Sequence, residues 1–92
     1  MKSYQKFHIL LTRYYIVETA YVMINCEMGA EGEILEGVKS IDSVKEVLGV
    51  FGNYDIVVKI ECPNVDEISE TIAKKIRQLR KVLYTTTLMC AN

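Results

Sequence analysis

A short turn and a pair of threonines carry the groups in this sequence that could best hold a small charged molecule. A turn that contains glycine exposes backbone N–H groups, which can bind a carboxylate. An aspartate beside it can accept a charge-assisted hydrogen bond from an ammonium group. Two threonines spaced two residues apart in a strand point their hydroxyls to the same side. The candidate binding residues are therefore Gly52, Asn53, Tyr54, Asp55, Thr85 and Thr87, with Val50 and Phe51 as apolar neighbours.

The same residues also suit a purely structural role. Gly52-Asn53 is typical of a tight turn, and aspartate commonly hydrogen-bonds the amides of such a turn. Threonine is common in strands. The residue types alone leave both explanations open.

The sequence gives little support for catalysis, metal binding, nucleic-acid binding or membrane insertion. The single histidine, His8, has no nucleophile or carboxylate placed near it by any motif, and phosphate-binding, dinucleotide-binding and zinc-protease motifs are absent. Cys26, Cys62 and Cys90 are isolated in apolar runs, which indicates free thiols in a reducing cytoplasm. A net charge of −1 gives no reason to expect nucleic-acid binding, and no segment can span a bilayer. We expect no catalytic residue, metal or cofactor.

The strands that position the candidate residues follow from the hydrophobic pattern. The clearest signal is an antiparallel hairpin over residues 47–60, whose first strand we expect over 44–51 and whose turn holds Gly52 to Asp55. Alternation predicts an earlier strand over 19–27 and a last strand over 82–90.

Two helices are expected between these strands. The first begins after Gly29, with Glu31 and Glu33 on a solvated face of its first turn. The second is capped by Asn64 or Asp66 and runs to about residue 80. The order β-α-β-β-α-β predicts an α+β, ferredoxin-like fold, in which a four-stranded antiparallel sheet carries both helices on one face.

The opposite face of such a sheet would be left uncovered and apolar. An exposed patch of that size on a small domain marks an interaction surface, and packing against a second copy is the simplest solution. The alternative is that an N-terminal arm, residues 1–17, folds back over it. The residues expected on this dimer interface are Tyr21, Met23, Val47, Phe51, Val57, Leu83 and Met89.

Three short motifs in a fixed order connect the sequence with a known family. They are Val50-Phe51-Gly52 at a strand end, Asn53-Tyr54-Asp55 before the next strand, and Thr85-x-Thr87 in the last strand. Over about residues 18–90 the sequence resembles the effector-binding domain, or RAM domain, of the Lrp/AsnC regulators. Members of that family usually carry a helix-turn-helix before this domain. Only 17 residues precede the first expected strand here, so we expect a stand-alone effector domain over 18–92 that makes no direct contact with DNA.

The resemblance implies a mode of action. It implies face-to-face dimers, rings of octamer size, and amino-acid effectors bound near the hairpin turn at Gly52 to Asp55, with Thr85 and Thr87 nearby. The expected function is non-enzymatic: amino-acid sensing and oligomerisation in the cytoplasm, acting on transcription or amino-acid metabolism through a partner, for which a full-length family regulator is a candidate. The alternatives are a dimeric ferredoxin-like enzyme of the monooxygenase or lyase type, and an assembly module without a ligand.

Overall fold

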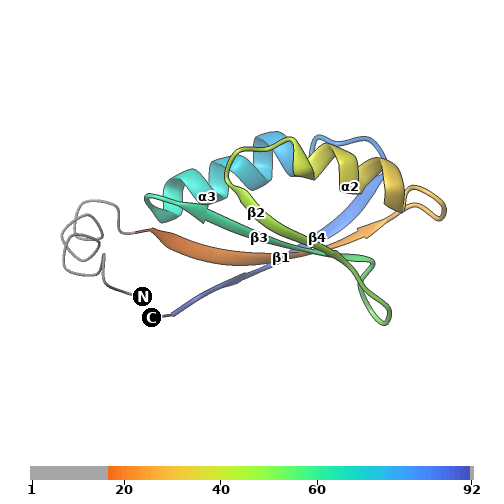
Figure 1. The fold of residues 1–92 in the computed structure, drawn as a ribbon, viewed down its shortest axis with the longest axis horizontal. Helices are drawn as coiled ribbons and strands as arrows, with labels where there is room; N and C mark the ends of the chain where they lie inside the picture. The colour runs from red at the N-terminus through yellow and green to blue at the C-terminus, as the bar shows by residue number, and fades with distance from the viewer. Residues whose placement is uncertain (1–16, 92) are drawn as a thin grey trace, which may run out of the picture.

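A computed structural model describes residues 17–91, which fold in the predicted order (Figure 1). The predicted arm, apart from Val17, lies outside the described residues. The elements are β1 (Glu18–Cys26), α2 (Glu31–Lys39), β2 (Val44–Gly49), β3 (Ile56–Cys62), α3 (Val65–Thr71), a π-helical turn η1 (Ile72–Ile76) and β4 (Val82–Met89).

The four strands form one antiparallel sheet in the order β2-β3-β1-β4. Both helices lie on the same side of it, as Figure 1 shows. The predicted ferredoxin-like fold is therefore confirmed. The two central strands, β1 and β3, pair from Glu18 opposite Cys62 to Ile24 opposite Ile56, so the end of β1 lies beside the start of β3.

The hydrophobic core lies between the sheet and the helices. Alternate residues of β1 and β3 face the helices and are buried, as their strict alternation predicts. The helices contribute a stripe at three- and four-residue spacing. The core residues from these elements are Ala20, Val22, Ile24, Cys26, Ile34, Val38, Ile56, Val58, Ile60, Cys62, Ile68, Ile72 and Ile76.

The second helix begins as predicted and ends sooner. Asn64 is its N-cap, because its Oδ1 accepts a hydrogen bond from the backbone N–H of Glu67 at 2.8 Å. The predicted end near residue 80 is wrong. After α3 the backbone widens into η1, where the N–H of Arg77 donates to the carbonyl of Ile72. Leu79 then packs against the core as part of the connection to β4.

The face of the sheet opposite the helices, called the open face here, differs in part from expectation. Residues directly opposite each other in an antiparallel pair share a face. By the β1–β3 register, Tyr21, Met23 and Val57 lie on the open face, as predicted. The register also shows that Leu48, Tyr84 and Leu88 lie there, opposite Val57, Asn25 and Tyr21 respectively.

Three residues predicted for the open face are placed elsewhere, and a fourth, Leu83, has no partner in the register that would assign it to a face. An irregularity between Val44 and Glu46 shifts the phase of β2, so Val47 lies opposite the buried Val58. Met89 lies opposite the buried Ala20, and Leu83 is the extra residue at an irregularity between β1 and β4. Phe51 lies beyond the end of β2, in the loop before β3, and its side chain is fully exposed.

Candidate functional site

The loop between β2 and β3 is held against the end of β1 by hydrogen bonds. The N–H of Asp55 donates to the carbonyl of Ile24 at 3.0 Å, and the N–H of Val50 donates to the carbonyl of Asp55 at 2.9 Å. Asn25 Nδ2 donates to the carbonyl of Asn53 at 2.7 Å. Gly52 has a φ of 119°, a backbone conformation that favours glycine. Contacts with β1, a hydrogen bond within the loop and the conformation of Gly52 together define the shape of this loop.

The carboxylate of Asp55 is part of the same attachment. Its Oδ2 accepts a hydrogen bond from the backbone N–H of Cys26 at 2.9 Å. The expected alternative, in which Asp55 binds amides of its own turn, is thus replaced by a bond to the neighbouring strand. The residue is only half-buried. No lysine or arginine of residues 17–91 forms an ion pair with it.

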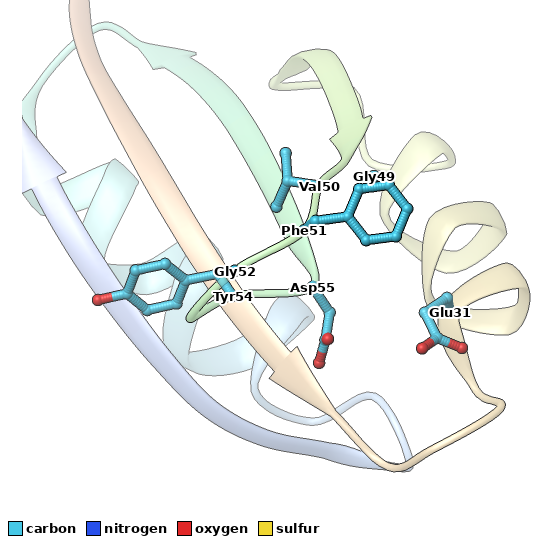
Figure 2. A pocket seen from close by; sticks show the side chains of 7 residues that line it. All are labelled: Glu31, Gly49, Val50, Phe51, Gly52, Tyr54 and Asp55. Atoms are coloured by element: carbon cyan, nitrogen blue, oxygen red, sulfur yellow. The ribbon is translucent and has the colours of Figure 1, made fainter.

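A hollow of about 420 Å³ opens beside this loop. Its lining residues are Glu31, Gly49, Val50, Phe51, Gly52, Tyr54 and Asp55. Figure 2 shows that the ring of Phe51 extends toward the side where Glu31 lies, whereas the ring of Tyr54 points the opposite way. The hollow thus combines apolar side chains, a glycine-containing loop and carboxylates from α2 and from the loop. This size lies within the range of small-molecule sites.

The thiol of Cys26 lies close to acidic residues. Burial raises the pKa of the Cys26 thiol above its ordinary value, and the nearby carboxylates of Asp55 and Glu31 raise it further. A negative charge on this thiol is therefore unfavourable. Asp55 and Glu31 also line the same hollow.

The structure brings together some of the residues predicted for the site. Gly52, Tyr54 and Asp55 line the hollow, whereas Asn53 contributes a carbonyl that is already bonded to Asn25. Thr85 and Thr87 lie on β4, opposite Ile24 and Val22, and do not line it. Thr85 borders a separate hollow of about 220 Å³ between β4 and Arg77.

Sequence reasoning did not include Glu31 among the site residues. It placed this glutamate on a solvated helix face, and the residue is exposed, but it also lines the hollow. A usable signal existed. Once the hairpin pairs with β1, the end of β1 lies beside the turn, and α2 begins only a few residues after that end. The first turn of α2 must therefore lie near the loop.

Two further findings concern the described part of the chain. No group of three or more His, Cys, Asp or Glu residues among residues 17–91 could hold a metal ion. None of the helices in this same range is long and apolar enough to cross a membrane.

The fold is that of a small α+β domain, and the hollow beside its β2–β3 loop is large enough for a small molecule. The family model described as "Lrp/AsnC ligand binding domain" matches residues 19–92, and the chain belongs to that family. This confirms the resemblance seen in the motifs around the turn. Proteins of this family regulate transcription and are not enzymes, and their effector-binding domains oligomerise and bind amino acids.

Similar proteins support the assignment. An uncharacterised HTH-type transcriptional regulator of Pyrococcus furiosus is 30% identical over 74 residues, which are 77% of this chain and 49% of that protein. The chain thus spans about half the length of the curated relatives it matches. The crystal structure of FFRP-DM1 is 30% identical in sequence to this chain and has a TM-score of 0.78. The matched region covers 80% of this chain and 99% of the FFRP-DM1 chain.

A second solved structure shares the fold alone. It is a transcriptional regulator from Neisseria meningitidis, solved as a complex with L-Met, and it is 10% identical to this chain. The matched region covers 87% of this chain and 53% of the regulator's chain, with a TM-score of 0.78.

Proposed function

We propose that this chain is an amino-acid-sensing and oligomerisation domain that binds its effector in the hollow beside the β2–β3 loop. The observation that carries the proposal is the half-exposed Asp55 carboxylate, without an ion-pair partner in residues 17–91, beside a glycine-containing loop in a ligand-binding family. Asp55 would bind the ammonium group of the effector, and backbone N–H groups of the loop would bind its carboxylate. The Neisseria meningitidis regulator solved with L-Met supports this kind of effector.

The proposal includes self-association through the open face. Six apolar or aromatic residues lie there, and an uncovered patch of this kind is typical of interfaces. A second copy can cover it by sheet-on-sheet packing about a twofold axis. The six residues are Tyr21, Met23, Leu48, Val57, Tyr84 and Leu88. Dimers would assemble further into rings, with the effector bound where dimers meet.

The biological role would follow from this assembly. The domain, residues 18–92 with a preceding arm, would bind an amino acid in the cytoplasm. It would then regulate a full-length member of the family by forming mixed oligomers with it. Thr85 and Thr87 would contact the effector only if a neighbouring subunit brought β4 to the hollow, because within one chain they do not line it.

Thermal unfolding with each of the twenty amino acids tests the sensing proposal. A ligand that binds the folded state raises its stability by RT ln(1 + [L]/Kd), which is about 2.7 kcal/mol at a concentration of 100 Kd. Asp55→Asn keeps an oxygen for the Cys26 amide and should abolish the shift. The control is Asp42→Asn, an exposed aspartate outside the hollow, which should keep it. Absence of any shift at millimolar concentrations would contradict sensing and favour an assembly module without a ligand.

A further inference from the structure

Glu31 places a second carboxylate at the hollow, and no cation of residues 17–91 neutralises it. Four ion pairs occur in this part of the chain, and none involves Glu31 or Asp55. Two carboxylates at one hollow repel each other unless a positive charge lies between them. Burial raises the pKa of the Cys26 thiol, and the charges of Asp55 and Glu31 raise it further.

The position of Glu31 in the first turn of α2 offers a competing explanation. Negative side chains there are stabilised by the helix dipole whether or not a ligand binds. The same turn also carries Glu33, which forms an ion pair with Lys81 at 3.4 Å and does not line the hollow. The two glutamates thus share the dipole and differ in their exposure to the hollow, which makes them a matched pair for an experiment.

The hollow also has an apolar wall at Phe51. The fully exposed ring of Phe51 extends toward the side where Glu31 lies, as Figure 2 shows. A molecule held by its ammonium group at Asp55 could extend an apolar stem along this ring. The far end of that stem would then approach Glu31, where a positive charge is favoured by the carboxylate and by the face of the aromatic ring.

We infer that the hollow selects an amino acid whose side chain ends in a positive charge, with Glu31 as the residue that determines this selectivity. The inference rests on the proposed function, because it takes Asp55 as the site of the α-ammonium group. The ligand class is a basic amino acid of the lysine, ornithine or arginine type. Glu31 contacts the terminal cation, and Phe51 contacts the stem.

Pairs of ligands that differ only in charge test this selectivity. L-Lysine is compared with L-norleucine, which keeps the stem and lacks the terminal amine, and L-arginine is compared with neutral L-citrulline. Calorimetric titration of the whole chain should give affinities for the charged members about tenfold higher, since a hydrogen bond between charged groups is lost in the neutral ones. Glu31→Gln should reduce each ratio to within about twofold.

The control variant is Glu33→Gln, which loses the same kind of dipole interaction and should leave both ratios as in the wild type. Equal binding of the charged and neutral members, or ratios unaffected by Glu31→Gln, would overturn the selectivity. If another amino acid binds and basic ones do not, the inference fails and the sensing function stands. If none of the twenty binds, both fail.

Discussion

At the scale of single residues, Asp55 has both a structural role and a proposed role in binding the effector. Its carboxylate accepts a hydrogen bond from the backbone N–H of Cys26, and its own N–H donates to the carbonyl of Ile24. Removal of the carboxylate would therefore weaken the attachment of the loop as well as any contact with an effector. This is why Asp55→Asn tests binding more cleanly than Asp55→Ala.

Lys81 is the one non-glycine residue with positive φ in the part of the chain that the structure describes. Its φ is 76°, it lies just before β4, and its carbonyl accepts a hydrogen bond from the N–H of Glu27. A left-handed conformation costs an ordinary residue about 1–2 kcal/mol, and glycine avoids this cost while losing about 0.5–1 kcal/mol in chain entropy. The position therefore stores local strain.

Lys81→Gly should be more stable than Lys81→Ala by about 0.5–1 kcal/mol. Both variants lose the partly exposed ion pair with Glu33, which is worth at most a few tenths of a kcal/mol, so their difference isolates the strain. Urea unfolding followed by circular dichroism gives both free energies. Equal stabilities of the two variants would show that the backbone at this position carries no strain.

At the scale of elements, the close approach of α2 to Leu79 depends on a glycine. A Cβ atom at Gly37 would lie 3.0 Å from Cδ2 of Leu79, whereas a Cβ at Gly32 would meet nothing within 4 Å. Both glycines weaken α2 by their low helix propensity. Only Gly37 offers a packing reason for its presence.

Gly32→Ala should stabilise the domain by about 0.5–1 kcal/mol, because alanine favours the helix and its methyl group is accommodated. Gly37→Ala should gain nothing or lose stability, since Leu79 must move from its place against the core. Thermal unfolding of the two single variants makes the comparison. If both alanines stabilise equally, the contact with Leu79 does not limit the approach of α2.

The elements also show where the sequence was informative and where it was not. The faces of β1 and β3 could be predicted because these central strands alternate strictly between buried and partly exposed residues. The faces of β2 and β4 could not be predicted. Irregular pairing near Lys45 and Leu83 changes which residues of these strands face the helices, and the hydrophobic residues of the two strands do not alternate strictly. The turn residues of the site were identified from local composition. Glu31 was missed because it reaches the hollow through tertiary packing.

At the scale of the whole molecule, the open face is the largest feature that a single chain leaves unexplained. The helices cover only the other side of the sheet, as Figure 1 shows. Three of the open-face residues, Leu48, Tyr84 and Leu88, are more than half exposed at 51%, 71% and 56%. The one ion pair on this face in the described chain joins Lys59 and Glu61 within β3 itself, so these two charges need no partner from another subunit.

Met23→Lys should convert the proposed dimer into a monomer. Met23 lies on a central strand of the open face, between Val57 of β3 and Thr86 of β4, and is only half-buried in one chain. In a twofold dimer the substitution places two lysines at the interface. Because burying unpaired like charges costs several kcal/mol, the affinity between the two subunits should fall by at least about 100-fold. The same change at Met28, which is fully exposed in the loop before α2, provides the control. Sedimentation velocity at micromolar concentration separates the outcomes. If the Met23→Lys protein remains dimeric, the contact lies elsewhere on the domain. If the wild type is monomeric, the proposed self-association is wrong, and so is any effector site formed between dimers.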